Sequence, residues 1–503
     1  NRIDADATAA LREGAVVTVN AGTASVTATN TSDIIADAGG FALSLSLGSS
    51  GASNAAAFGA AFAVNTIGTE DDPNLVDALV DASQLSASDG VTLEALSLLG
   101  ISAWTMGGAG AVNGQQQSVL TGSLAGAYSA NTMRTSTQAR VRSGSTVTTT
   151  GGDAAIGARN ASSITADAGG FAVALRKAGS SGASVSVGAS VALNDIANTT
   201  EALVDGATVA SGAAITIDAN GTGSIDALTM AGALSATLGS NGLNFGFAGA
   251  GAGSGNKVAN TIEAGVRNRA ALTTQGGGAV RVSATDERYA FDLGWSSAAQ
   301  LNDAGTQDDD VDGTSANEAT LDEVGDRAIR ASLKTAFAAQ GVEFDSNPTV
   351  STIEPGAAWL VSEAGGAAYV LRLEAGVFKA YATTLIHADA GAVAISLGLS
   401  KGGGSSINGS FGASGAVNAV TNTVRAQIDD ATVTAAGAVD VQATSTATIN
   451  VLTIAGAGGG SVSGSGGFGI TLAGAGTGSG NAVDNTVEAL IGNGSTVRSG
   501  AGQ

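Results

Sequence analysis

Residues 194–219 read NDIANTTEALVDGATVASGAAITIDA, an Asn-centred frame followed by a strand-like run, a turn and a second strand-like run. The frame returns with paired asparagines at matching places: Asn194 and Asn198, Asn256 and Asn260, Asn418 and Asn422, Asn481 and Asn485. Copies follow one another about every 62 residues. Self-similarity at a fixed period predicts a solenoid, in which each unit buries its face against its neighbours.

Alternating apolar and polar residues near the end of each unit indicate strands with one buried face. The triplets that carry this pattern are Val17-Val19-Ala21, Val91-Leu93-Ala95, Ala154-Ile156-Ala158, Ile215-Ile217-Ala219, Val280-Val282-Ala284 and Val439-Val441-Ala443. The first half of each unit is rich in Gly, Ala and Ser and reads as two extended strands joined by a turn, such as 179–182. We therefore expect an all-β repeat solenoid, a large-rung β-helix of roughly four strands per unit or a coil with a long projecting hairpin.

Two versions of the unit alternate along the chain. One opens with IIADAGG at 34–40 and ITADAGG at 164–170, and the other with WTMGG at 104–108 and LTMAG at 228–232. The chain begins with Asn1, which we align with the second Asn of the frame, and ends before the last strand of a unit. We expect it to be an interior piece of a longer protein.

The recurrent Asn frame has two interpretations. Asparagine amides at matching positions of stacked rungs can form a structural ladder, and a periodic carbohydrate- or ion-binding face would show the same repetition. Thr and Ala neighbours, together with the scarcity of aromatic residues (4%), favour the ladder.

Composition and charge exclude several classes of function. The net charge of -22 makes nucleic acid and anionic membrane surfaces poor partners. The absence of Cys from the sequence removes disulfides and thiolate metal sites. The longest apolar runs are short and broken by Gly and Ser, so we expect no transmembrane segment.

One region interrupts the repeats. We divide the chain into solenoid repeats at 1–285, an inserted α+β module at 286–383, and further repeats at 384–503. The module contains two of the three Trp residues, Trp295 and Trp359. Residues 317–339 have helical apolar spacing. The short runs 358–362, 367–373 and 377–382 predict an antiparallel meander with the aromatic residues in its core.

The module also carries the sharpest chemical motif. Alternate acids followed by Gly313 match the first half of a calcium loop, in which carboxylates at every second position enter one oxygen cage. The candidate ligands are Asp308, Asp310, Asp312, Thr314 and Glu318. Glu318 falls one residue before the place of the bidentate acid, so a plain acidic linker is the competing interpretation. Calcium is the only cofactor that the sequence suggests.

No catalytic constellation is recognisable in the sequence. The sole histidine, His387, falls in a strand where we expect it to face solvent. Without Cys or a second His, nucleophilic triads and His-based zinc sites lack support. We expect a protein that is not an enzyme.

The frame N-x-x-x-N-T-x-E-A followed by A-x-V-x-x-x-G-x-V-x-V-x-A resembles the repeats of giant bacterial surface proteins, the filamentous-haemagglutinin-like and β-solenoid adhesins. The resemblance implies an extracellular or cell-surface rod or filament that serves adhesion or structure. Its partners would be neighbouring repeats, copies of itself joined end to end through exposed strand edges, and cell-surface or matrix polysaccharide. A carbohydrate-binding or carbohydrate-active β-helix protein is the alternative.

Overall fold

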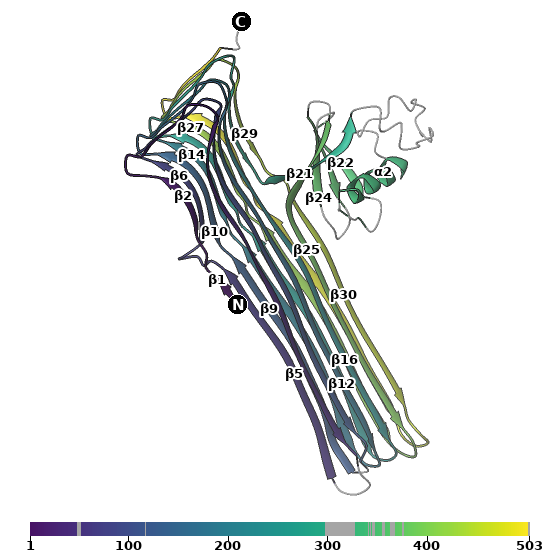
Figure 1. Cartoon of the computed structure of the whole chain (residues 1–503). Helices are drawn as coiled ribbons and strands as arrows, with labels where there is room; N and C mark the ends of the chain where they lie inside the picture. The colour runs from purple at the N-terminus through teal and green to yellow at the C-terminus, as the bar shows by residue number, and fades with distance from the viewer. Residues whose placement is uncertain are drawn as a thin grey trace, which may run out of the picture.

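A computed structural model of the chain is an all-β solenoid that confirms the predicted fold class (Figure 1). It describes residues 1–47, 52–115, 117–296, 327–340, 342, 344, 348–354, 358–362, 368–374 and 377–500. Each turn of the coil, or rung, passes through four parallel sheets, which we call B, C, D and A in the order in which the chain meets them.

Sheets B and C contain short strands. Sheet B consists of β2 (Ala7–Leu11), β6 (Asn74–Asp81), β10 (Thr135–Arg142), β14 (Thr199–Asp205), β18 (Thr261–Arg267), β27 (Thr423–Asp429) and β32 (Thr486–Gly492). Sheet C consists of β3 (Val16–Val19), β7 (Gln84–Ala87), β11 (Thr146–Thr149), β15 (Thr208–Ser211), β19 (Ala271–Thr274), β28 (Thr432–Ala435) and β33 (Thr496–Ser499).

Sheets D and A contain long strands. Sheet D consists of β4 (Thr23–Ser46), β8 (Gly90–Asn113), β12 (Ala154–Ala178), β16 (Ile215–Gly239), β20 (Val280–Thr285), β25 (Val377–Ser400), β29 (Val439–Thr444) and β30 (Ala447–Val462). Sheet A consists of β1 (Arg2–Ile3), β5 (Ala52–Ile67), β9 (Gln117–Met133), β13 (Gly182–Ile196), β17 (Leu243–Val258), β26 (Ser405–Val420) and β31 (Gly469–Val483).

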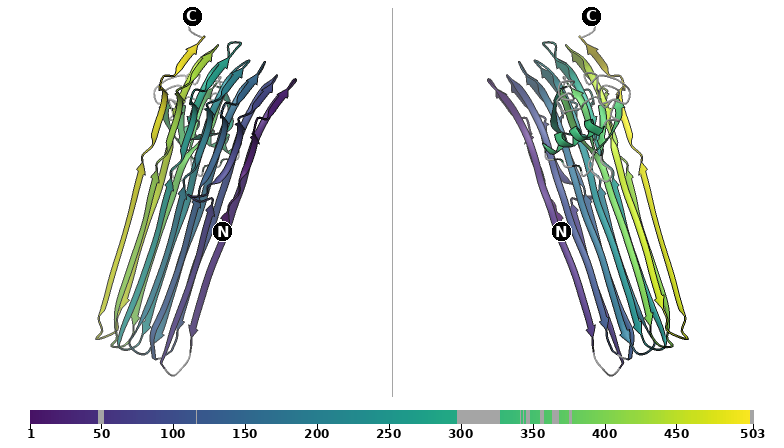
Figure 2. Two further views of the ribbon diagram at one scale, coloured as in Figure 1. Left: turned by 90° about the vertical axis from the view of Figure 1, so that its left-hand side faces the viewer. Right: turned by 90° about the vertical axis from the view of Figure 1, so that its right-hand side faces the viewer.

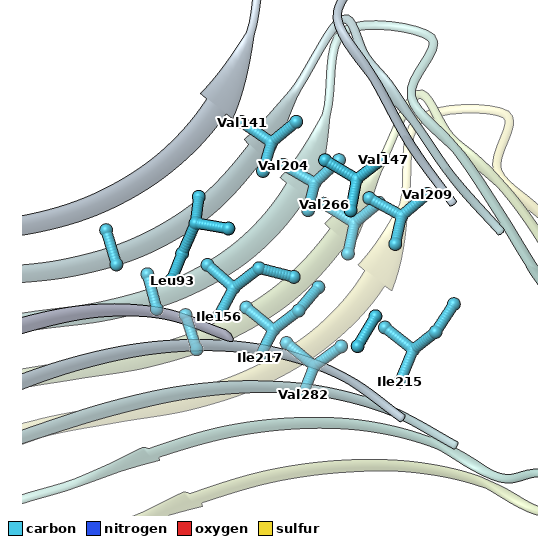
Figure 3. Close-up of a cluster of buried hydrophobic side chains, with 14 of the residues drawn as sticks. Leu93, Val141, Val147, Ile156, Val204, Val209, Ile215, Ile217, Val266 and Val282 are labelled. Carbon is cyan, nitrogen blue, oxygen red and sulfur yellow. The ribbon is translucent and has the colours of Figure 1, made fainter. Parts of the chain in front are cut away.

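The first part of each sheet D strand closes a three-sided body with sheets B and C. Apolar side chains from the three sheets stack rung upon rung inside it, among them Val141 and Val204 on sheet B and Leu93, Ile156 and Ile217 on sheet D (Figure 3). These side chains are at most 1% exposed. The predicted alternation therefore marks the core of the body.

One predicted triplet was wrong. Val17 lies in β3 of sheet C, whereas the strand equivalent to the other triplets is β4. Its residues Ala24 and Ala28 pair with Val91 and Ala95. Ala24 stands where Val91, Ile215 and Val280 stand in other rungs, so the apolar signal is weaker at the correct place than one strand earlier.

Beyond the body, sheets D and A continue as a flat two-layer fin (Figures 1 and 2). We define the fin as residues 38–64, 105–131, 168–194, 229–256, 390–418 and 453–481. Each range is a long hairpin whose two arms belong to different sheets, so its strands pair with the rungs above and below instead of with each other. Each rung is therefore a coil with a long projecting hairpin, one of the two predicted forms.

The two layers of the fin lie close together because their facing side chains are small. Ala172, Ala192, Ala231 and Ala248 are buried between them. Across the layers, the Ser186 hydroxyl donates to the Ala172 carbonyl oxygen at 2.7 Å. Ala, Gly and Ser thus bring two long sheets together where larger residues would hold them apart.

The inserted module interrupts the fifth rung. β20 ends at Thr285, and the chain returns to the solenoid through β25, whose pairing changes from β24 at Ala382 to β16 at Leu385. The module contains β21 (Glu287–Ser296), α2 (Arg327–Ala338), β22 (Thr349–Glu354), β23 (Ala358–Ser362) and β24 (Ala368–Glu374). Its antiparallel strands and helix enclose an aromatic core that includes Trp359, Phe337 and Phe378. The side chain of Trp295 and the start of the expected helix lie outside the described residues.

Candidate functional site

The first Asn of each frame belongs to a continuous ladder at the base of the fin. Each amide Nδ2 donates to the Oδ1 of the Asn in the next rung at 2.7–2.8 Å. The ladder contains Asn1, Asn65, Asn131, Asn194, Asn256, Asn418 and Asn481. Arg2 pairs with Thr66, so Asn1 occupies the first position of the frame, and its assignment to the second was wrong.

The second Asn of each frame forms a parallel ladder that uses the backbone. The backbone N–H of Asn198 donates to Asn260 Oδ1 at 3.1 Å, and the same bond joins Asn260 to Asn422 and Asn422 to Asn485. Within its own rung, the Asn198 amide also donates to Ser162 Oγ at 2.9 Å. Both ladders hold rungs together, and their central members are at most 4% exposed, which leaves no amide face open to a carbohydrate.

Charged side chains on the outer face of sheet B form a third ladder, which no motif in the sequence indicated. Aspartates alternate with arginines from rung to rung: Asp81 faces Arg142 at 3.2 Å, and Asp205 faces Arg267 at 3.0 Å. Because opposite charges face each other only in this register, a slip of one rung would bring like charges together. The charges therefore repeat every two rungs. The two alternating versions of the unit repeat with the same period.

The predicted calcium ligands Asp308, Asp310, Asp312, Thr314 and Glu318 lie outside the described residues. Among the residues that the structure does describe, no group of three or more His, Asp or Glu side chains is arranged to hold a metal ion. No helix in that part of the chain is long and apolar enough to cross a membrane.

His387 lies on the outward face of β25, as expected, with the buried Ile386 and Ala388 on either side of it in the strand. Its side chain is 18% exposed and lies between two carboxylates, with Nδ1 at 3.1 Å from Asp226 Oδ1 and Nε2 at 3.2 Å from Asp389 Oδ1. The hydrogen bond with Asp226 raises the pKa of the imidazole above its ordinary value. The histidine thus links neighbouring strands β16 and β25, and no nucleophile is hydrogen-bonded to it among the described contacts.

Two consecutive acids join the module to the solenoid. Asp286 is fully buried and accepts hydrogen bonds from Ser445 Oγ at 2.6 Å and from Asn422 Nδ2 at 3.2 Å. Glu287 forms a forked ion pair with Arg372 of the module, with Nη2 at 2.7 Å from Oε2. The junction therefore contacts the solenoid through Asp286 and the inserted sheet through Glu287. Its only signal in the sequence is the position of the two acids directly after the last residue of the repeat.

Burial raises the pKa of Asp286 to about 7, so we expect the fold to lose stability as the pH rises from about 4 to about 7. In that window the folded chain holds a proton that the unfolded chain has released, which costs about 1.4 kcal/mol per pH unit. Asp286→Asn should flatten the pH dependence of the melting temperature. The exposed Asp292, on the next strand, supplies the matched control Asp292→Asn. An unchanged pH profile in Asp286→Asn would contradict the assignment.

The fin contains one buried charge. Arg176 is 1% exposed, and its guanidinium donates to the Ser118 carbonyl at 2.6 Å, to the Ser180 carbonyl at 2.9 Å and to Asn244 Oδ1 at 2.7 Å. Burial lowers its pKa. Because these acceptors belong to three successive rungs, Arg176 fastens the layers near the tip.

The outer faces of the fin are apolar, the reverse of the ordinary arrangement in which large residues face inward. Phe58 and Phe62 on sheet A are each 71% exposed, as is Phe41 on sheet D. The fin ranges contain no Asp or Glu, and their basic residues are Arg176, Lys177 and Lys401. The excess negative charge of the chain is therefore confined to the body and the module.

Bulky residues and glycines alternate between rungs on the outer face of sheet D. The ring of Phe41 lies over Gly108 of the next rung, and Phe171 lies over Gly232 in the same way. A side chain at either glycine would collide with the ring. The alternation fills each gap with a neighbour's side chain and produces a continuous apolar surface.

Comparisons of the chain with protein-family models, with curated proteins and with solved structures found no match. The fold and these surfaces are thus the basis for assigning a function.

Proposed function

We propose that this chain is a structural segment of an extracellular array, a rod or filament on or outside a bacterial cell that serves adhesion or cohesion. The observation that carries the proposal is the unbroken Asn ladder, which passes through every rung with the same bond and nearly the same length. An interaction that each rung both accepts and donates can be extended by any further rung. This is what a protein that grows by stacking requires.

The ladder of charges supports the same function. Surface ion pairs contribute little to stability singly, typically below about 1 kcal/mol, but their alternation fixes which rung follows which. Stacking is then specific as well as extendable, whether the next rung comes from the same chain or from another copy.

The carbohydrate alternative draws little support from the described faces. Acids on sheet B, such as Asp77 and Asp205, are paired with arginines. The exposed rings of the fin, such as Phe58 and Phe62, lie among Ala and Gly with no acid in the same ranges. Binding of calcium by Asp308, Asp310, Asp312, Thr314 and Glu318, and of surface polysaccharide by the module, remain proposals.

Immunogold labelling of the intact cells that produce the protein tests this function. Antibodies raised against the purified chain should decorate the cell surface or fibrous material around the cells, without permeabilisation. An antibody against a cytoplasmic protein of the same cells, applied in parallel, should label only after lysis. Label that appears only in lysed cells would contradict an extracellular array.

A further inference from the structure

We propose that the outer face of sheet A is a pairing surface for a second copy of this chain, with the two fins packed face to face and their tips pointing in opposite directions. The face consists of the outward residues of β5, β9, β13, β17, β26 and β31. The inference concerns side-to-side contact and does not depend on the proposed extracellular function, which concerns growth along the stack.

Access favours sheet A over sheet D. The chain enters the inserted module through β21 and returns to the solenoid through β25 of sheet D, with which β21 and β24 both pair. In Figure 1 the module lies beside β25 and β30, on the side of the fin away from β5 and β9. A second fin can therefore approach sheet A without meeting the module.

The sheet A face has areas with large side chains and areas of Gly and Ala. In three strands these areas lie at different ends of the fin, one near the tip and the other near the body. On β17, β26 and β31, the half near the tip carries Phe245, Phe247, Ile407, Phe411, Ile470 and Leu472. Phe247 and Phe411 form a ridge, with ring centroids 5.9 Å apart. The half near the body is mostly glycine, at Gly251, Gly253, Gly255, Gly476, Gly478 and Gly480.

The other three strands carry bulky residues in both halves. On β5, β9 and β13, Phe62, Tyr128, Val191 and Leu193 lie near the body, and Phe58, Leu124 and Val187 lie nearer the tip. A row of Ala and Gly crosses the middle of the whole face: Ala60, Gly126, Ala189, Gly251, Ala413 and Gly476. This row and the ridge beside it make a surface with both knobs and holes.

A two-fold axis along the stacking direction makes the outward residues of β17, β26 and β31 complementary to their own copies. It reverses tip and base but keeps each rung opposite its own copy, so the Phe247–Phe411 ridge of one fin falls on the glycines of the other. An isologous contact of this kind uses one patch twice. A lipid layer, the alternative partner for an apolar face, would gain nothing from such complementarity. Lipid chains contact the halves with large side chains and the glycine-rich halves equally well.

Charge selects this orientation over one with both tips at the same end. The fin has no acidic residue, whereas the body and module carry all 43 Asp and Glu. Opposed tips place the two acidic bodies beyond opposite ends of the contact, separated by more than the Debye length of about 8 Å. Parallel tips would place the bodies side by side.

The area is sufficient for a stable pair. Six strands about 4.8 Å apart and an apolar length of about ten residues give a face of roughly 1,000 Å². A standard interface buries about 800 Å² on each partner. One fin face therefore meets the requirement for a specific dimer.

Sedimentation velocity of the whole chain tests the pairing. The protein should dimerise reversibly with rising concentration, and Gly251→Glu should weaken the dimer at least about a hundredfold, because the new carboxylate would be buried without a partner. Gly391→Glu is the matched control on sheet D. A Cβ atom added at either glycine would have no other atom within 4 Å. Both variants should therefore fold, and circular dichroism would verify this.

Three results would overturn the proposal. The first is a protein that stays monomeric at every attainable concentration. The second is a dimer that Gly251→Glu and Gly391→Glu weaken equally. The third is wild-type protein that floats with phosphatidylcholine vesicles, with flotation reduced equally by both substitutions. Orientation has its own readout, because the chain lacks Cys and Ser240→Cys places a single spin label at the tip. Opposed tips predict a label separation comparable to the apolar length, roughly 35 Å. A short separation would contradict the orientation.

Discussion

Gly188→Ala should lower the apparent melting temperature of the chain more than any surface substitution, although it adds a single methyl group. Gly188 faces inward on β13, where the new Cβ would overlap the carbonyl oxygen of Gly232 and press on that of Gly170. Both obstacles are backbone atoms of sheet D, so no side chain can rotate away. Overpacking of this kind costs about 1–3 kcal/mol even where neighbours can adjust, and Gly188→Val should cost more.

The matched control is Gly126→Ala on the neighbouring strand β9. Gly126 faces outward, and a side chain there would meet no atom within 4 Å. Its melting temperature should stay within the error of the wild type. If thermal unfolding followed by circular dichroism gives the two variants the same stability, the layers of the fin do not lie as close together as described.

Asn194→Leu should produce the other large loss of stability. Asn194 accepts from Asn131 at 2.8 Å and donates to Asn256 at 2.8 Å, so leucine breaks the first ladder in both directions. Asn131 keeps a bond to Ser129 Oγ, but the buried Oδ1 of Asn256 loses its donor. A buried polar group without a partner costs about 1–3 kcal/mol, and we expect a total in the upper part of that range.

Asn481→Leu removes the same side chain from the outermost described position of the ladder. Asn481 is exposed and accepts a single bond, from Asn418 at 2.8 Å, so water can replace what is lost. Urea denaturation of the two variants should separate them clearly. Equal midpoints would mean that the ladder follows from the stacking without stabilising it.

The repeat and the body core were predictable because their signals are local. Triplets such as Ile215-Ile217-Ala219 alternate in the ordinary way, with the larger side chains inward. The paired Asn residues also share one spacing throughout, and stacking brings equal positions together. The error at Val17 has the same origin, since the strongest alternation in the first rung does not belong to the equivalent strand.

The orientation of the fin strands could not be predicted from apolar pattern alone. In 38–47 the alternation of Phe41, Leu43 and Leu45 with Ala42 and Ser44 resembles an ordinary half-buried strand with the large residues inside. The structure places the large residues outside, because a second sheet covers the small ones. Only packing of one arm of the hairpin against the other decides which face is inner.

The junction residues were missed for a different reason. Asp286 and Glu287 contact Asn422, Ser445, Thr446 and Arg372, which are between 85 and 160 residues away in the sequence. An acid pair at the end of a repeat gives no sign of such partners. The same holds for His387, which faces outward as expected but has contacts with Asp226 and Asp389 that the sequence does not indicate.

Hydrogen–deuterium exchange, resolved by peptide, tests most directly the claim that the fin is a stacked part of the solenoid. Every fin strand of the inner rungs pairs on both sides, so peptides from 229–256 should exchange as slowly as peptides from 194–219 in the body, except at the turn near the tip. Rapid exchange along the whole of 229–256, with protection confined to the body, would contradict the account.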